Sequence, residues 1–240
     1  MEHDEGFSFG MGVFETMLVR DGRCILFGKH MERLRNGMEV LGMDREFDPS
    51  SILDIIMDGH LDGRVLKVEV SRRNTIITDR EMTYTEKDHR NGFRLITSKV
   101  LRNETSPLTY IKSLNHADCI MEKRKAKSEG FDEPVFLNTK GFITEGATSN
   151  IFLTDGDEIV TPSVDSGILP GTVRSFIIEN MDVRECHLEP GDIADYTGCF
   201  LTNSLFGVMN VSSFNDITFS DRRTSDDVRR FYEDAVENGI

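Results

Sequence analysis

The sequence Ile111-Lys112-Ser113-Leu114-Asn115 places a lysine between apolar residues. The hydrophobic spacing predicts that a loop leads here into a helix over 113–128, which ends at Gly130. Burial disfavours the charged form of an amine, so a lysine partly withdrawn from water becomes a nucleophile able to form a Schiff base. Most lysines near a helix start are ordinary solvated residues, so the segment indicates chemistry only together with the rest of the chain.

Further along the chain, Thr144-Glu145-Gly146-Ala147-Thr148-Ser149-Asn150 sets a carboxylate among small and hydroxylated residues. A strand is predicted to follow over 150–153. A carboxylate buried at the end of a strand requires a cationic partner, and a protonated pyridine nitrogen is one such partner. The alternative is a glutamate in a turn that Ser149 and Asn150 help to form.

A third segment, Gly167-Ile168-Leu169-Pro170-Gly171-Thr172-Val173-Arg174, opens a predicted helix that begins at Gly171. The first turn of a helix presents backbone N–H groups and the positive end of the helix dipole, which together favour phosphate binding. Pro170 and Gly171 are equally common as simple helix-start residues. On its own this segment is compatible with both interpretations.

The net charge restricts the partners of the chain. Its 240 residues include 28 Lys and Arg against 42 Asp and Glu, which gives a formal charge of −14. Such a field repels phosphate backbones, so we exclude nucleic acid and anionic membranes as partners bound through a basic surface. Hydrophobic residues make up 38% of the chain, enough for a core, and an anionic ligand must be held by local cations or backbone amides.

Cysteine usage and the N-terminus favour a cytoplasmic protein. The four cysteines are far apart and form no Cys-x-x-Cys pair, so we expect reduced thiols and no metal site. The opening Met1-Glu2-His3-Asp4-Glu5 resembles no signal peptide. The longest uncharged stretch, 196–215, carries too many polar side chains to span a bilayer. We therefore expect no membrane-spanning segment.

Hydrophobic spacing predicts a mixed α+β or α/β chain in two parts. In the first part we expect strands over 14–20, 65–71 and 93–100 and helices over 29–41 and from Pro49. In the second part we expect the helix over 113–128, strands over 135–137, 142–144, 150–153, 183–188 and 199–201, a helix from Gly171 and a final helix over 226–237. The polar segment 101–107 separates them, so we predict domains of residues 1–104 and 105–240.

In this order and spacing, the three segments resemble the fold type IV family of pyridoxal phosphate enzymes. This family includes aminodeoxychorismate lyase, D-amino acid aminotransferase and branched-chain aminotransferase. The resemblance extends over nearly the whole chain and includes 6–16, His30-Met31-Glu32-Arg33-Leu34 and 201–205. It implies a two-layer α/β N-terminal domain and a C-terminal pseudo-barrel domain that anchors pyridoxal 5'-phosphate. It also implies a small-molecule amine substrate and a homodimer.

The resemblance implies roles for individual residues. Lys112 matches the lysine that holds the cofactor covalently and then moves protons, and Glu145 matches the carboxylate that keeps the pyridine nitrogen protonated. Arg33 matches a phosphate-binding arginine, and Leu169 matches the apolar residue packed against the ring. The other matches are phosphate-binding positions, namely Gly171, Thr172 and Val173 at the helix start and Asn203 and Ser204 in a second loop.

The N-terminus departs from the family in two ways. Family members usually begin with an additional edge strand before an Asp-Arg-Gly turn, whereas this chain begins almost at the turn and has Asp4-Glu5-Gly6. The edge of the N-terminal domain is therefore expected to be shortened. The Gly-Asp-Gly of the family is Gly10-Met11-Gly12 here. Both changes concern substrate and dimer contacts rather than the cofactor.

Local sequences favour the lyase within this family. Lys112-Ser113-Leu114-Asn115 resembles the lyase and D-amino acid branches more than the branched-chain branch, and 71–76 lacks the Arg-x-His pair of the D-amino acid enzymes. Thr16 lies where the lyase has a hydroxyl beside the cofactor, and 202–205 is also lyase-like. The resemblance thus implies conversion of 4-amino-4-deoxychorismate to 4-aminobenzoate and pyruvate, a step of folate biosynthesis. Lys112 would be the base and Thr16 a proton relay, unless Thr16 is simply a strand residue chosen for β propensity.

Two other functions are compatible with the same residues. A class IV aminotransferase acting on D- or branched-chain amino acids uses the same lysine, and a non-catalytic binding protein of the same fold belongs to another functional class. His116 is expected one turn into the helix that follows the lysine. Arg72 and Arg73 are expected either near a substrate carboxylate or on the surface.

Overall fold

The structure is a computed structural model that describes residues 1–57 and 61–240. The chain forms two compact units with separate cores. Unit 1 comprises Met1–Thr83, Ile111–His116 and Asn238–Ile240, and unit 2 comprises Tyr84–Tyr110 and Ala117–Glu237. The segment 84–110 thus groups with the later part of the chain, and the predicted domain division at residue 104 stays a prediction.

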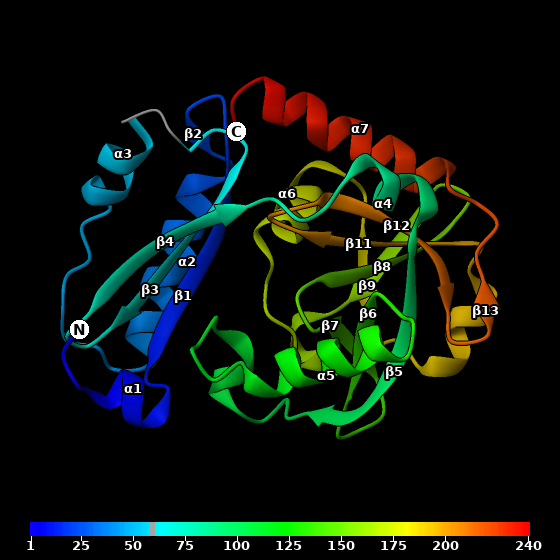
Figure 1. Cartoon of the computed structure of the whole chain (residues 1–240). Coiled ribbons are helices and arrows are strands. Elements are labelled where there is room, and N and C mark those ends of the chain that lie inside the picture. The colour runs from blue at the N-terminus through cyan, green and yellow to red at the C-terminus, as the bar shows by residue number, and fades with distance from the viewer. Residues whose placement is uncertain (58–60) are drawn as a thin grey trace. The chain divides into compact units, whose positions relative to one another are not determined.

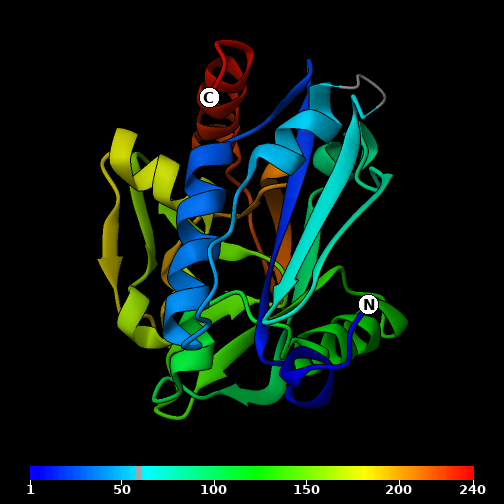
Figure 2. The same ribbon diagram turned by 90° about the vertical axis from the view of Figure 1, so that its left-hand side faces the viewer.

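Unit 1 is a two-layer α/β unit, as the family resemblance implies. Its antiparallel sheet has the order β2-β1-β3-β4 and is formed by β1 (Gly12–Arg20), β2 (Arg23–Cys24), β3 (Arg64–Ser71) and β4 (Thr75–Glu81). Its helices are α1 (Glu5–Phe9), α2 (Phe27–Val40) and α3 (Ser50–Met57). Helix α2 packs along β1, as Figure 2 shows. The strands expected over 14–20 and 65–71 and both expected helices are confirmed.

The two faces of β1 carry different kinds of side chain. Because side chains alternate along a strand, Val13, Glu15 and Met17 share one face, and Phe14 and Thr16 share the other. The face with Val13 and Met17 packs on apolar residues of α2 and β3, including Met31, Leu34, Met38 and Val68. The fully buried Glu15 is the polar exception on this face.

The segment 111–116 is not helical, and only Ser113 forms a β-bridge with β1, which corrects the predicted helix start at Ser113. The N–H of Phe14 donates to the carbonyl of Lys112 at 2.8 Å, and the N–H of Leu114 donates to the carbonyl of Gly12 at 2.9 Å. A helix would need the same backbone groups for its own hydrogen bonds, so pairing with β1 excludes it. The helix begins only at Ala117, and His116 precedes it rather than lying within it.

Unit 2 is built on a nine-stranded sheet of order β10-β9-β8-β11-β12-β5-β6-β7, with β13 beside β12 (Figure 1). The strands are β5 (Phe93–Arg102), β6 (Glu133–Asn138), β7 (Ile143–Gly146), β8 (Asn150–Asp155), β9 (Glu158–Pro162), β10 (Arg184–Cys186), β11 (Gly198–Asn203), β12 (Gly207–Phe214) and β13 (Ile217–Thr218). Strand β7, at one end of this order, also packs against β8 and β9. The sheet therefore curls on itself, which confirms the expected pseudo-barrel.

Helices cover this sheet. They are α4 (Glu86–Asn91), α5 (Ala117–Ser128), α6 (Thr172–Asn180) and α7 (Arg223–Glu237), together with short 3₁₀ turns at Pro107–Tyr110, Val164–Ser166 and Pro190–Asp195. On α5, Cys119 and Ala126 are buried, whereas Ile120 and Met121 are 36% and 66% exposed. Lys123 of the same helix is half-buried, and its ammonium donates to Thr148 Oγ1 at 2.6 Å. Small buried side chains and a polar contact therefore both hold this helix.

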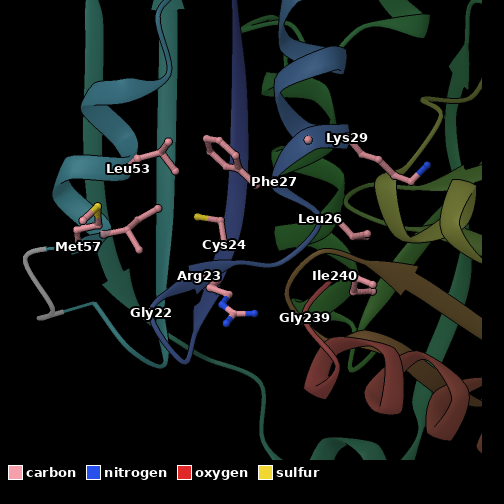
Figure 3. Close-up of a pocket in the computed structure, with 12 residues that line it drawn as sticks. Gly22, Arg23, Cys24, Leu26, Phe27, Lys29, Leu53, Met57, Gly239 and Ile240 are labelled. Atoms are coloured by element: carbon pink, nitrogen blue, oxygen red, sulfur yellow. The ribbon is translucent and has the colours of Figure 1, made fainter.

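Unit 1 contains a pocket of about 510 Å³ between the start of α2 and the end of α3 (Figure 3). Its wall includes Cys24, Phe27, Leu53 and Met57. Among the described residues that line it, none belongs to the set predicted for the cofactor site. Over residues 1–57 and 61–240, no helix has both the length and the apolar character needed to cross a bilayer.

Candidate active site

Lys112 is held by its backbone pairing with β1, and its side chain reaches the ring of Phe14. The ammonium nitrogen lies 4.5 Å from the ring centroid, within the range of a cation–π contact. The ring of His116 packs edge-on against the same phenylalanine, with the centroids 5.5 Å apart. Gly10 packs closely against the end of this segment. It has a positive φ of 69°, and a Cβ at position 10 would lie 2.6 Å from Asn115 Oδ1. The lysine therefore has a fixed backbone and an aromatic neighbour.

Thr16, the predicted proton relay, lies two residues beyond Phe14 on the same face of β1. It stands opposite Lys67 of β3 in the antiparallel register, and its side chain is half-buried. In unit 1, Thr16 thus lies on the same face of β1 as the phenylalanine whose ring Lys112 contacts.

Arg33 projects from α2 into a buried ionic cluster that the sequence did not predict. Its Nε and Nη2 donate to the two carboxylate oxygens of Glu15, each at 2.7 Å. His30 Nδ1 lies 2.6 Å from Glu15 Oε2. Glu15 and His30 are fully buried, and the Arg33 side chain is 12% exposed. Glu15 thus engages the Nε–Nη2 edge of the guanidinium in a two-point, charge-assisted pair.

The protonation states of this cluster follow from its geometry. Burial alone would raise the pKa of Glu15, but the charges of Arg33 and His30 outweigh it and lower that pKa to about 2. Burial lowers the pKa of His30, with partial opposition from Glu15. Because an ionised carboxylate only accepts hydrogen bonds, His30 Nδ1 must carry the hydrogen. The cluster at neutral pH is therefore an anionic Glu15, a cationic Arg33 and a hydrogen-bonded imidazole.

Replacing Glu15 with glutamine should lower the free energy of unfolding by about 3 kcal/mol at pH 7, because a largely buried guanidinium loses its counter-charge. The folded-state pKa of Glu15, about 2, lies below its usual 4.5, so the ionised group stabilises the fold above about pH 4.5. That contribution is lost as the pH falls towards 2. Denaturant unfolding of both proteins should therefore show a constant difference above about pH 5 that shrinks at lower pH.

Asp79 provides the matched control for this prediction. Its carboxylate accepts from Arg64 Nε at 2.6 Å, but both side chains are more than a third exposed. Asp79→Asn should change the unfolding free energy by less than about 1 kcal/mol. Equal effects of the two substitutions would contradict a special role for the buried pair.

Glu145 is the penultimate residue of β7 in unit 2 and is 4% exposed. Arg102 Nη2 donates to its Oε1 at 2.6 Å, and the N–H of Leu169 donates to its Oε2 at 3.1 Å. Asn150 Nδ2 lies 3.3 Å from the same Oε2. The buried carboxylate is therefore oriented by a cation and two neutral donors. The sequence did not predict Arg102, which lies 43 residues before it.

Asn150 connects the glutamate to the start of α6. Its Nδ2 also donates to the carbonyl of Leu169 at 2.9 Å, and a Cβ at Gly171 would meet its Oδ1 at 2.0 Å. Position 171 therefore accepts only glycine, which is the N-cap of α6 and offers no side chain to its first turn. Thr172 and Val173 are the first two residues of this helix and are buried, so the predicted helix start is confirmed.

The second predicted phosphate loop lies after β11. Asn203 Oδ1 accepts from the N–H groups of Leu205 and Phe206 at 2.9 and 3.0 Å, and its Nδ2 donates to the carbonyl of Thr148 at 3.1 Å. These bonds shape the turn that carries Ser204. The strand before it pairs with β8 so that Thr202 stands opposite Asn150. Strand β8 therefore brings together four of the predicted cofactor-site residues, namely Glu145, Leu169, Gly171 and Asn203.

The residues of unit 2 fit a phosphorylated pyridine. Within the described part of the chain, Thr202 Oγ1 is buried and has no hydrogen-bond partner. Such a group normally has one, so a ligand oxygen beside Asn203 would supply it. The first turn of α6 offers backbone N–H groups without a capping side chain. A buried carboxylate, an uncapped helix start and an orphaned hydroxyl match the ring nitrogen and phosphate of the cofactor.

Comparison with known proteins identifies relatives over the whole chain. The family model described as Amino-transferase class IV matches residues 12–214. The aminodeoxychorismate lyase of Bacillus subtilis (strain 168) is 24% identical, over 99% of this chain and 89% of that protein. The D-alanine aminotransferase of Bacillus licheniformis is 26% identical, over 90% and 83%. The crystal structure of 4-amino-4-deoxychorismate lyase from Pseudomonas aeruginosa has a TM-score of 0.83 at 22% identity, covering 100% of this chain and 96% of that one, and shows the same fold.

These matches confirm the family that the sequence motifs indicate, and with it a fold type IV enzyme that uses pyridoxal 5'-phosphate. They do not distinguish lyase from aminotransferase, because relatives of both kinds match at similar identity. The family model spans most of the sequence, including the lysine, the arginine and the glutamate described above. The chain belongs to the class IV aminotransferase family of pyridoxal phosphate enzymes.

Proposed function

We propose that the chain is an aminodeoxychorismate lyase, which converts 4-amino-4-deoxychorismate to 4-aminobenzoate and pyruvate. The observation that carries this proposal is the position of Thr16, which shares a strand face with the phenylalanine that contacts Lys112. A base and a hydroxyl are what the lyase needs, because one proton leaves a carbon and another reaches the departing group. Similarity to the Bacillus subtilis lyase supports the same function.

The proposal gives each predicted residue a task toward the cofactor. Pyridoxal phosphate, when bound, supplies an electron sink conjugated with the substrate amine. Lys112 would attach it, Glu145 would accept a hydrogen bond from its ring nitrogen, and Leu169 would pack on its ring. The groups that would hold its phosphate are Arg33, the first turn of α6 at Gly171, Thr172 and Val173, and Asn203 and Ser204.

The reaction then needs two proton movements by side chains of unit 1. Lys112 Nζ removes the proton from the carbon that bears the substrate amine. The bond between the neighbouring ring carbon and the enolpyruvyl oxygen breaks, and the ring becomes aromatic. Thr16 Oγ1 relays a proton to the departing enolpyruvyl group, which leaves as pyruvate. The aromatic product makes the step favourable.

An aminotransferase is the second candidate, supported by the similarity to D-alanine aminotransferase. The turn between β3 and β4 has arginines but no histidine two residues after them. Arg72 lies 3.6 Å from a carboxylate oxygen of Glu5, and Arg73 lies 3.9 Å from one of Glu2, and all four side chains are exposed. These surface pairs do not form the substrate-carboxylate clamp of the D-amino acid enzymes, which favours the lyase.

One experiment separates the two activities. The protein loaded with pyridoxal phosphate is incubated with aminodeoxychorismate and, separately, with a panel of L- and D-amino acids. Release of 4-aminobenzoate supports the lyase. Conversion of the cofactor to its pyridoxamine form, reversed by a 2-oxo acid, without release of 4-aminobenzoate would contradict it. We further propose a role in folate biosynthesis, a cytoplasmic location and a homodimer, the last testable by light scattering.

Thr16→Val should lower lyase turnover by about 10- to 100-fold while the visible absorbance of the bound cofactor stays unchanged, because only the proton relay is lost. Thr16→Ser should restore most of the turnover, since it keeps the hydroxyl. Thr78→Val is the control, because Thr78 is an exposed strand threonine of the same sheet. Unchanged 4-aminobenzoate release by the valine variant would show that Thr16 is only a strand residue.

A further inference from the structure

A buried glutamate that has no task in the proposed reaction lies in unit 2. Glu133 is the first residue of β6, and its side chain is 1% exposed. The ammonium nitrogen of Lys123 lies 2.9 Å from Glu133 Oε2 and donates to Thr148 Oγ1 at 2.6 Å. Burial alone would lower the pKa of Lys123, but the charge of Glu133 outweighs it and raises that pKa. The two side chains therefore form a largely buried ion pair.

The second oxygen of Glu133 accepts hydrogen bonds from the turn between β7 and β8. The N–H of Thr148 donates to Glu133 Oε1 at 2.7 Å, and the hydroxyls of Thr148 and Ser149 donate to it at 3.0 Å each. A Cβ at Gly146 would lie 2.8 Å from the same oxygen, so the backbone of the turn packs closely on it. The turn of residues 146–149 is thus built around one carboxylate.

This turn connects two groups that are predicted to hold the cofactor. Glu145, the proposed partner of the ring nitrogen, immediately precedes it in the chain. Within the turn, the carbonyl of Thr148 accepts from Asn203 Nδ2 at 3.1 Å. Asn203 also accepts from two N–H groups of the loop that carries Ser204. The carboxylate of Glu133 therefore fixes the backbone to which the second phosphate loop is bound.

A buried ion pair is not the usual way to stabilise a protein core. Apolar side chains of the same volume often give equal or greater stability, because two charges must otherwise be removed from water. Hydrogen bonds to a carboxylate, in contrast, are directional and hold their donors in one geometry. The arrangement around Glu133 therefore favours a role in positioning over a role in stability alone.

We propose that Glu133, held by Lys123, is a positioning residue for the phosphate of the cofactor. It acts through the carbonyl of Thr148, which binds Asn203 and with it the second phosphate loop. This inference rests on the proposed function, because it assumes that Asn203 and Ser204 hold the phosphate. Glu133 itself touches neither the cofactor nor the substrate in this proposal.

Loss of Glu133 should weaken binding of the phosphate and spare binding of the ring. The ring partner Glu145 has its own donors in Arg102 and the N–H of Leu169, and neither contacts Glu133 through a described hydrogen bond. Pyridoxal 5'-phosphate and pyridoxal differ only in the phosphate, so the ratio of their affinities reports on the phosphate site. A residue needed only for folding would lower both affinities equally.

The test is a titration of the full chain, after removal of bound cofactor, with each compound, followed by the visible absorbance of the bound form. The wild type should bind pyridoxal 5'-phosphate at least about a hundredfold more tightly than pyridoxal, because the phosphate forms charge-assisted hydrogen bonds. In Glu133→Ala the affinity for pyridoxal 5'-phosphate should fall at least about tenfold, while that for pyridoxal should change less than about twofold. Glu133→Gln should recover most of the affinity, since its amide oxygen can still accept from the N–H of Thr148.

Lys123→Met tests the other half of the ion pair and carries the test if Glu133→Ala does not fold. It should lower the affinity for pyridoxal 5'-phosphate about three- to tenfold and leave that for pyridoxal unchanged, because the carboxylate loses its charged partner. Arg229→Met is the matched control. Arg229 is also a cation on a helix of unit 2, is 21% exposed against 25% for Lys123, and donates to Glu233 at 2.7 Å. Its replacement should leave both affinities unchanged.

Ser204→Ala tests the proposed phosphate loop separately, and it should lower the preference for pyridoxal 5'-phosphate. An unchanged preference would contradict that loop and, with it, the role of Glu133. If Ser204→Ala lowers the preference whereas Glu133→Ala and Lys123→Met do not, only the inference about Glu133 is overturned. Equal weakening of both compounds by the folded variants would overturn it as well, because it would show a structural role alone.

Discussion

Lys112→Ala should lower the rate of 4-aminobenzoate release at least about a thousandfold, because in the proposed reaction one amine both attaches the cofactor and moves the proton on the reacting carbon. It should also abolish covalent trapping. In the wild type, borohydride treatment should leave a phosphopyridoxyl group on the peptide that contains Lys112, and mass spectrometry should find none in the variant. The pairing of residues 112 and 114 with β1 uses only backbone atoms, so the variant should keep its fold.

Lys140→Ala is the control for this experiment. Lys140 is an exposed lysine in the turn between β6 and β7, far along the chain from the Phe14 ring. Its replacement should leave both turnover and trapping at the wild-type level. A Lys112→Ala protein that still traps the cofactor at another lysine with normal turnover would show that the catalytic amine has been misassigned.

The regular elements could be predicted where burial and hydrophobic spacing agree. Strands β1 and β3 alternate buried and less buried side chains, and α2 buries Met31, Leu34 and Met38 at helical spacing. Strand β4 was missed because it lies at the sheet edge with nearly all of its side chains exposed. Its strand conformation comes from pairing with β3, which is a contact that local spacing does not encode.

The helix predicted from Ser113 was wrong for a similar reason, because the backbone there pairs with a distant segment. The carbonyl of Lys112 and the N–H of Leu114 form hydrogen bonds with a strand that lies about a hundred residues earlier in the chain. No local sequence pattern indicates this pairing. Glu15 and His30 were present in the motifs that carry the family resemblance, but neither received a role. Glu15 lies 15 residues before His30 and 18 residues before Arg33. Only the packing of α2 on β1 brings the three side chains together.

The polar segment 101–107 shows that polar composition does not always mean solvent exposure. Polar residues between regular segments usually mark a solvated connection, which is why a boundary was predicted there. In the structure Arg102 ends β5 and pairs with the buried Glu145, and Glu104 is 9% exposed and accepts from Thr139. These charges are buried because each has a partner more than thirty residues away. The sequence did contain a reason to look for a cation such as Arg102, because a buried carboxylate at position 145 requires a cationic partner.

Glu145→Ala should lower lyase turnover by about 100- to 1000-fold while the cofactor stays bound, because in the proposed site the ring nitrogen loses the anion that keeps it protonated. The substitution also leaves Arg102 in the same buried place without its carboxylate, so a positive charge replaces a neutral pair beside the ring. Both effects disfavour a protonated ring nitrogen. The measurement is turnover together with the visible absorbance of the bound cofactor, which should persist.

Arg102→Met distinguishes this role from a purely structural one. If the pair matters only for stability, removing either partner should damage the enzyme about equally, since each leaves a buried charge behind. If Glu145 acts on the ring nitrogen, the methionine variant keeps the essential anion, which still accepts from the N–H of Leu169. It should then retain turnover within about tenfold of the wild type, well above Glu145→Ala. Equal losses in two folded, cofactor-bound variants would mean that the ring nitrogen does not depend on Glu145.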